Sequence, residues 1–347
     1  MPHSVSVFGS AGFTGALTAR LLYRHPSLEL RAITARSDVG RRLDDLYPHH
    51  RVPLELEELD LDRHADVDAA VVAYPHGAAA PVVAELRERG VRVVDLSADF
   101  RLRDPAVYGR WYREHEAPEL LDEAVYGLPE LYREEIRGAS LVANPGCYPT
   151  ASLLALAPLA RAGVVDDVVI DAKSGVSGAG RAATEKTHFV TVDENLNAYG
   201  VPRHRHIPEI EQELALLDPA HPDVRITFIP HLVPLDQGEL VSCYVTLSED
   251  AVDPGSLEAL YAEAYADEPF VELAAAPPGV RDVRETNICR ISVHHDERTG
   301  RAIVFGAIDN LWKGAASQAV QNLNLMLGLP EDEGIGVGRT PAQEALR

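Results

Sequence analysis

Basic residues and cysteines are scarce in this chain of 347 residues. Lys and Arg together number 32 against 54 Asp and Glu, so the formal net charge is −22. Because a phosphate backbone or an anionic bilayer must be met by clustered cations, this balance argues against nucleic acid and membrane surfaces as partners. The three cysteines have no CxxC spacing, which suits neither a disulfide scaffold nor a structural zinc site.

Long apolar runs are absent as well. No stretch approaches the ~18 uninterrupted apolar residues that a membrane-spanning helix needs. Residues 1–11 show an apolar strand with no basic region ahead of it, unlike a secretory signal. No spacing of His, Cys and Asp is persuasive as a metal site. We therefore expect a metal-free protein of the reducing cytoplasm.

Apolar strands and helices alternate through the first half of the chain. Helices are predicted at residues 15–23 and 79–89, and strands at 4–8, 28–34, 69–73, 91–96 and 140–143. The strands are apolar throughout, as in a parallel sheet that is buried on both faces. This pattern predicts an α/β fold with a Rossmann-type, doubly wound domain, interrupted by a looser region at residues 101–137.

The pattern changes after a predicted helix at residues 149–162. Strand candidates then follow with few helices between them, at residues 168–172, 224–230, 240–247, 288–294 and 302–308. Such a run is typical of a mixed or antiparallel sheet, so we expect a second domain of α+β type. A last helix is predicted over residues 315–327, with Gly328 as its stop.

Three glycines lie between the first predicted strand and the first helix. A tight turn of this kind lets backbone amides approach a diphosphate at the positive end of a helix, where a Cβ would block the approach. Glycine turns also occur at such junctions without a ligand. The position at the first βα junction nevertheless favours a dinucleotide site at Gly9, Ser10, Ala11, Gly12, Phe13, Thr14 and Gly15.

The end of the second strand bears on which dinucleotide is bound. An NAD site usually places a carboxylate there for the ribose hydroxyl, whereas a 2′-phosphate needs cationic and hydroxyl donors. Here Arg36 and Ser37 can offer a guanidinium and a hydroxyl to that phosphate. We therefore expect NADP(H) as the cofactor, while Asp38, which comes next, keeps NAD open as the alternative.

One cysteine lies in a distinctive segment, residues 144–150 (NPGCYPT). Two prolines and a glycine fix the backbone around the thiol, and Pro149 suits the first turn of the following helix. Cys147 is therefore expected at a helix N-terminus, where the partial positive charge favours a thiolate nucleophile. Cys243 and Cys289 lie within strand patterns and are expected to be core residues.

A nucleophilic thiol needs a proton-transfer partner, typically an imidazole. The cluster His204-Arg205-His206 precedes a predicted amphipathic helix at residues 210–217 and is the strongest candidate among 14 histidines, although an exposed polar helix start would look the same. The glycine-rich segment 173–181 (KSGVSGAGR) has two readings. It is either an anion site built from backbone amides or a flexible loop.

Taken together, these segments resemble the N-acetyl-γ-glutamyl-phosphate reductases, the arginine-pathway branch of the aspartate-semialdehyde dehydrogenase superfamily. The likeness covers essentially the whole chain. Besides the glycine turn, it is carried by residues 75–77, 95–101, 126–130, 144–150, 173–181, 204–210 and 308–314. The only three lysines of the chain, Lys173, Lys186 and Lys313, lie in or beside these segments.

The resemblance implies NADPH-dependent reduction of an acyl phosphate to an aldehyde through a covalent thioester. Cys147 would attack the γ-carbonyl and expel phosphate, and hydride would convert the thioester to a thiohemiacetal that collapses to the semialdehyde. The family's imidazole falls at His204 or His206. We place it at His204, with His206 and Glu209 at the substrate. Backbone amides of the Cys147 helix, with Asn144 nearby, would stabilise the oxyanion.

The same resemblance implies the remaining roles. The substrate would meet Arg101, Ser174 and Lys313, and the cofactor would meet Pro75, Ser177, Gly178, Ala179, Gly180 and Asn310. Residues 1–147 would form the NADP-binding domain, completed by a C-terminal helix at 314–347, and residues 148–313 the substrate and subunit-contact domain. A homodimer or homotetramer acting on a small-molecule acyl phosphate is implied.

The chain departs from the resemblance at one place. After residues 230–234 the family usually shows Arg, Gly and an aliphatic residue, where this chain has Gln237, Gly238 and Glu239. A cation is lost and an anion gained, so a different substrate stays open. One alternative is a lysine-pathway relative that reduces an aminoadipyl phosphate on an acidic carrier protein, to which a charge of −22 is poorly suited. The other is a non-catalytic nucleotide-binding regulator.

Overall fold

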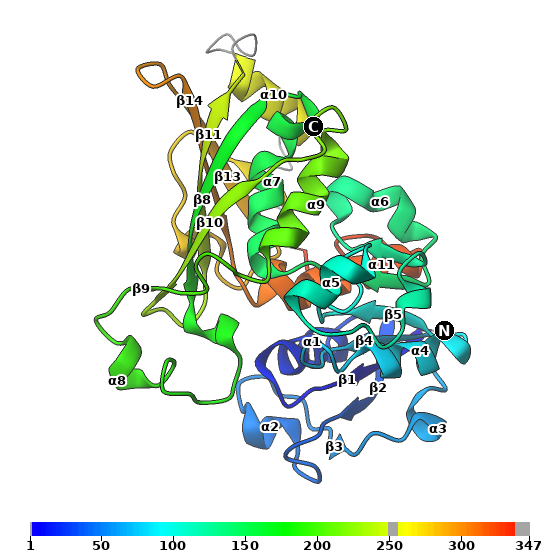
Figure 1. The fold of residues 1–347 in the computed structure, drawn as a ribbon. Helices are drawn as coiled ribbons and strands as arrows, with labels where there is room; N and C mark the ends of the chain where they lie inside the picture. The colour runs from blue at the N-terminus through cyan, green and yellow to red at the C-terminus, as the bar shows by residue number, and fades with distance from the viewer. Residues whose placement is uncertain (1, 249–255, 337–347) are drawn as a thin grey trace, which may run out of the picture.

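Two seven-stranded sheets organise the chain. The computed structural model describes residues 2–248 and 256–336, and Figure 1 shows the first sheet in blue to cyan and the second mainly in green, yellow and orange. All neighbouring strands of the first, N-terminal sheet are parallel, in the order β3-β2-β1-β4-β5-β7-β6. Its strands are β1 His3–Phe8, β2 Leu28–Thr34, β3 Leu56–Glu57, β4 Ala69–Val72, β5 Arg92–Asp95, β6 Ala124–Tyr126 and β7 Leu141–Ala143.

Helices cover both faces of the N-terminal sheet. Val5 and Val7 of β1 belong to the same core as helices α1 (Phe13–Tyr23) and α11 (Ser317–Met326). Phe8 faces the other way and packs in the core of α4 (Ala80–Glu88). Because alternate residues enter opposite cores, the strands are apolar throughout. The predicted Rossmann-type domain is confirmed.

The second, C-terminal sheet is mixed, in the order β12-β13-β14-β11-β8-β10-β9. It comprises β8 Val165–Gly175, β9 Asn197–Ala198, β10 Ile226–Val233, β11 Glu239–Leu247, β12 Val271–Leu273, β13 Cys289–Asp296 and β14 Arg301–Ile308. One face packs against α7 (Cys147–Arg161), α9 (Ile207–Leu217) and α10 (Ser256–Ala264). The expected α+β arrangement of this half is therefore confirmed.

The opposite face of the C-terminal sheet is uncovered within the described part of the chain. Ala172, Val241 and Val304 point toward α7 and are fully buried. Tyr244 and Ile303 pair across β11 and β14 on the other face and remain half-exposed. Figure 1 shows no helix on that side of the sheet.

Several elements went unpredicted. Residues 101–137, expected to be loose, contain α5 (Pro105–Trp111), β6 and α6 (Pro129–Arg137). Both helices begin with proline, and Asp104 caps α5 by accepting the Ala106 N–H at 2.7 Å. Prolines that suggested a loop therefore start helices. The other helices are α2 Leu43–Leu46, α3 Leu61–His64 and α8 Phe189–Val192.

The C-terminal helix returns to the N-terminal sheet. A π-helical turn at Trp312–Ala316 leads into α11, which packs against α1 and α6. The helix ends at Met326 and Gly328 has φ of 72°, so the predicted glycine stop is confirmed. The predicted helix over 314–347 is thus too long within the described chain, and residues 337–347 lie outside it. Domain division at residue 147 stays a prediction.

No described helix is both long and apolar enough to cross a bilayer.

Candidate active site

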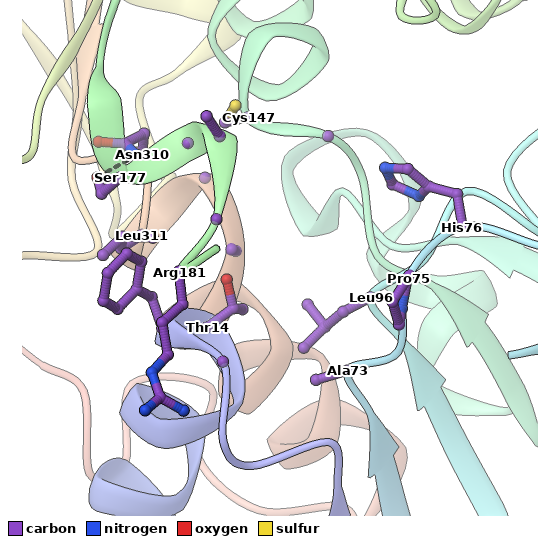
Figure 2. A pocket seen from close by; sticks show the side chains of 18 of the residues that line it. Thr14, Ala73, Pro75, His76, Leu96, Cys147, Ser177, Arg181, Asn310 and Leu311 are labelled. Carbon is purple, nitrogen blue, oxygen red and sulfur yellow. Dashed lines mark hydrogen bonds between the residues drawn. The ribbon is translucent and has the colours of Figure 1, made fainter. Parts of the chain in front are cut away.

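A cavity of about 860 Å³ lies where the carboxyl ends of the N-terminal strands meet the C-terminal sheet. The residues after β1, β2, β4, β5 and β7 all contribute to its wall, as do Ser174 near the end of β8 and residues 177–181 after that strand. In Figure 2 Cys147 lies above Thr14, with Ser177 and Asn310 on one side and Pro75 and His76 on the other. Ligands of doubly wound sheets bind at this edge.

The glycine turn at the cavity floor fits a dinucleotide. Gly9 has φ of 99°, and a Cβ there would lie 2.5 Å from the Ala73 carbonyl oxygen. A Cβ on Gly15 would lie 2.3 Å from the Gly9 carbonyl oxygen, whereas a Cβ on Gly12, the N-cap of α1, would meet that oxygen only at 3.9 Å. The turn therefore needs two of its glycines for its own shape and leaves the helix N-terminus accessible to a diphosphate. All the predicted turn residues line the cavity except Ser10, whose buried hydroxyl donates to the Val7 carbonyl. At Ser10 the predicted cofactor contact is therefore left to the backbone, because its side chain is turned into the protein.

Arg36 and Ser37 line the cavity beyond the turn. The Arg36 guanidinium lies 4.8 Å from the centre of the Tyr74 ring. The Asp38 carboxylate, which would suit a ribose hydroxyl, is instead held by Arg181 at 2.6 Å and by Arg41 at 3.2 Å. These cations lower the Asp38 pKa, Arg181 contributing most. The Asp38 carboxylate, which kept NAD open as the alternative, is thus already paired with two arginines.

A second loop borders the cofactor side of the cavity. Ser177, Gly178, Ala179 and Gly180 line it, together with Pro75. The Asn310 amide joins this loop to its neighbour, donating to Ser177 Oγ at 3.0 Å and accepting the Gly238 N–H at 2.8 Å. The predicted cofactor-side residues other than Ser10 are therefore brought together by the fold.

Cys147 is the first residue of α7 and Gly146 is its N-cap, as predicted. The thiol is half-buried and lines the cavity. Burial, and then the nearby Glu239 carboxyl, raise the pKa of Cys147 well above its usual value. These two effects oppose the helix terminus, which favours the thiolate.

Behind the Cys147 turn lies a buried ion pair. Glu209 is 1% exposed and accepts the Gly146 N–H and the Tyr126 hydroxyl, each at 2.9 Å, and its carboxylate lies 3.3 Å from Arg101 Nη1. Arg101 also donates to the carbonyls of Asn144 and Leu96. Glu209 does not line the cavity, so its predicted contact with substrate is wrong. Arg101 does line the cavity, which leaves its substrate role open.

Asn144 also supports the turn from behind. Its side chain is fully buried, its Oδ1 accepts from Asn322 at 3.0 Å, and its Nδ2 points to the carbonyls of Pro145 and Ala315. It does not line the cavity. Asn144 therefore cannot act as the predicted oxyanion donor, because its amide is used within the protein.

Two imidazoles line the cavity beside Cys147, but they are placed differently. His206 lies against the turn: a Cβ on Gly146 would be 2.6 Å from its Nε2. His204 instead packs on the rings of Tyr148 and Tyr199. Its Nδ1 accepts the backbone N–H of His206 at 3.2 Å. Burial lowers the pKa of both, to about 4 for His204, so both are neutral bases at pH 7.

Lys313 is the clearest error among the predicted site residues. Its side chain is fully buried, pairs with Glu130 at 2.6 Å and donates to Gln321 at 2.9 Å. It does not line the cavity, so its predicted role at the substrate is wrong. Ser174 is the opposite case, because it lines the cavity and is opposite Glu239 in the sheet.

The cavity is positively charged although the chain is acidic. Five cationic side chains line its wall, and none of its described lining residues is Asp or Glu; the cations are Arg36, Arg101, Arg181, Lys186 and Arg205. Arg181, Lys186 and Arg205 had no predicted site role, and neither had His76, which also lines the cavity. The turn after β4 carries His76, a position that strand order alone could have indicated. Nor do the described residues include a group of His, Cys, Asp and Glu that could hold a metal.

The fold and this site define a semialdehyde dehydrogenase. The family model described as "Semialdehyde dehydrogenase, NAD binding domain" matches residues 4–139, and "Semialdehyde dehydrogenase, dimerisation domain" matches residues 147–310. Aspartate semialdehyde dehydrogenase II of Vibrio cholerae, complexed with ASA, superposes with a TM-score of 0.71 at 19% identity, covering 94% of this chain and 99% of that one. The Candida albicans enzyme with NADP gives a TM-score of 0.70 at 14% identity over 94% and 99%.

Similar sequences define the family more narrowly. The N-acetyl-gamma-glutamyl-phosphate reductase of Desulforudis audaxviator is 52% identical over 95% of this chain and 97% of its own. That of Alkalilimnicola ehrlichii is 51% identical over the same shares. The chain belongs to the N-acetyl-γ-glutamyl-phosphate reductase family, and the resemblance noted in the sequence is confirmed.

Proposed function

We propose that this chain reduces N-acetyl-γ-glutamyl phosphate to N-acetylglutamate 5-semialdehyde and phosphate, with NADPH, in arginine biosynthesis. The observation that carries the proposal is one cavity that joins the glycine turn to Cys147 and His206. Its relatives at 51–52% identity bear the name of this reductase. The aminoadipyl and non-catalytic alternatives have no comparable support.

The chain's own residues supply the covalent chemistry. We propose His206 as the base, rather than His204, which the sequence favoured. His206 accepts the Cys147 proton as sulfur attacks the γ-carbonyl, because its neutral imidazole lies against Gly146, the residue that precedes Cys147. A carbon–sulfur bond forms and phosphate leaves. The oxyanion is held by backbone N–H groups of the first α7 turn, other than that of Gly146, which Glu209 already binds. Bound NADPH supplies the hydride that reduces the thioester.

The cationic wall selects an anionic substrate. Arg205, and Arg101, which lines the cavity while paired with Glu209, are our candidates for the phosphate and carboxylate. Because the rest of the chain is strongly acidic, these cations create a local attraction that the surface lacks. The wall thus suits a small acyl phosphate with two anionic groups, a phosphate and a carboxylate.

The reverse reaction tests the proposal. With N-acetylglutamate semialdehyde and phosphate, the purified protein should reduce NADP⁺, and omission of phosphate should abolish the reaction. Inactivity of a protein that still binds NADP⁺ would contradict the proposed substrate. Activity without phosphate would contradict acyl-phosphate chemistry.

Cofactor choice gives a separate prediction at Arg36. The Arg36→Ala variant should bind NADPH about 10–100-fold more weakly, the loss expected for a charged hydrogen bond to phosphate. Its NADH affinity should change less than about threefold, because NADH has no 2′-phosphate. Fluorescence titration measures both affinities. The control is Arg41→Ala, because Arg41 is a nearby arginine that contacts Asp38 but does not line the cavity. Equal losses for the two cofactors would refute NADPH selection by Arg36.

We further propose a homodimer or homotetramer in the cytoplasm. The open face of the C-terminal sheet, with half-exposed Tyr244, Ile303 and Phe305, belongs to the segment matched by the dimerisation-domain model. Pairing of two such faces would cover it. The three cysteines are all free, in keeping with a reducing compartment.

A further inference from the structure

A buried carboxyl group lies beside the nucleophilic cysteine. Glu239 is the first residue of β11, where it pairs with Ser174 on β8 and Ile308 on β14. Val241 and Ala172, two positions along these strands, point into the core beneath α7. Because side chains alternate along a strand, Glu239 and Ser174 point to the same side, toward the end of α7 where Cys147 lies.

The carboxyl group of Glu239 has few partners. The residue is fully buried, and neither oxygen has a protein partner with full hydrogen-bond geometry. The Cys147 thiol and the Ser174 hydroxyl are the side chains within hydrogen-bonding reach. An unpaired carboxylate in such a place is costly, so the group is expected to be neutral or to share a proton with a neighbour.

The surrounding charges favour a shared proton. Burial raises the pKa of the Glu239 carboxyl to about 8, and repulsion from the Asp309 carboxylate acts in the same direction. The groups that oppose these effects on Cys147 are the backbone N–H of Tyr148 and then Arg101, which is ion-paired with Glu209. The other titratable groups coupled to the pair are Tyr148, Tyr199 and Cys289. None of these three carries a positive charge that could stabilise a thiolate.

We propose that Glu239 is a positioning residue that holds the Cys147 thiol protonated in the free protein. The inference rests on the proposed role of Cys147 as nucleophile. It also gives the departure from the family pattern a consequence: the aliphatic residue that the family usually has at this position could neither hydrogen bond to the thiol nor share its proton. The proton stays on sulfur until the imidazole removes it during attack.

The test is the pH dependence of Cys147 alkylation in the full-length, ligand-free protein. Iodoacetamide labelling from about pH 6 to pH 10, followed by peptide mass spectrometry, gives an apparent pKa. The Glu239→Gln and Glu239→Leu variants should label about tenfold faster at pH 8, equivalent to a midpoint about one pH unit lower. An unchanged midpoint, or slower labelling, would overturn the proposal. Ultraviolet absorbance of the thiolate measures the same midpoint without a reagent.

Controls separate this effect from loose packing and from the proposed activity. Glu213 is also a buried carboxyl with a raised pKa, but it is bound by Tyr132 and Gln212. Glu213→Gln should leave the Cys147 midpoint unchanged, and a shift equal to that of Glu239→Gln would overturn the proposal. The buried Cys243 and Cys289 should stay unlabelled in every variant, since labelling there reports unfolding. Full activity of Cys147→Ser would refute the proposed nucleophilic role of Cys147, whereas the midpoint measured in the parent would stand.

Discussion

Replacing Cys147 with serine should lower phosphate-dependent NADP⁺ reduction by at least about 1,000-fold, the scale of effect when a covalent nucleophile is removed. Serine has nearly the shape of cysteine, but its hydroxyl is far harder to ionise than the thiol. Because the glycine turn lies on another part of the cavity wall, NADPH affinity should change less than about twofold. Steady-state rates and fluorescence titration measure the two effects.

The matched control uses a cysteine of the sheet. Cys289 is fully buried in β13 and does not line the cavity. Cys289→Ala should retain activity within about threefold, although its unfolding free energy should fall by about 1 kcal/mol for the lost packing. Retention of activity by Cys147→Ser would refute the thioester route. Loss of NADPH binding together with activity would indicate damage to the fold instead.

Features set by neighbouring residues were predictable from the sequence. The glycine turn, the N-terminal position of Cys147 on α7 and the stop at Gly328 each depend on a few adjacent residues. The alternation of strands and helices likewise indicated two layers of helix around a parallel sheet. The glycine turn and the helix stop each suit a residue without Cβ, and the start of α7 suits a proline with its fixed φ.

Roles that depend on distant contacts were not predictable. Nothing near Glu209 in sequence shows that its carboxylate would bind Gly146, 63 residues earlier, and so face away from the cavity. Glu239 is a similar case, because only strand register brings it to Ser174 and Cys147. A polar residue in a segment near the site can support that site or touch a ligand, and only its partners distinguish the two roles.

Lys313 gives the largest expected effect on stability. In Lys313→Met, Glu130 would remain buried with no cation, and breaking one side of such a pair typically costs about 3–5 kcal/mol of unfolding free energy. Lys173→Met is the matched control. Lys173 pairs with Asp171 at the same 2.6 Å but is 28% exposed, so its loss should cost less than about 1 kcal/mol. Urea unfolding measures both variants.

A second substitution and a change of pH identify why the Lys313→Met variant loses stability. Lys313→Met combined with Glu130→Leu should recover most of the lost stability, because no unpaired carboxylate remains. In the parent, burial would raise the Glu130 pKa, but Lys313 outweighs this and lowers it. Without Lys313 the folded-state pKa should exceed the unfolded value, so the single variant should gain stability relative to the parent as pH falls from about 8 to about 5. Unchanged stability with a raised KM for the semialdehyde would instead assign Lys313 to the substrate.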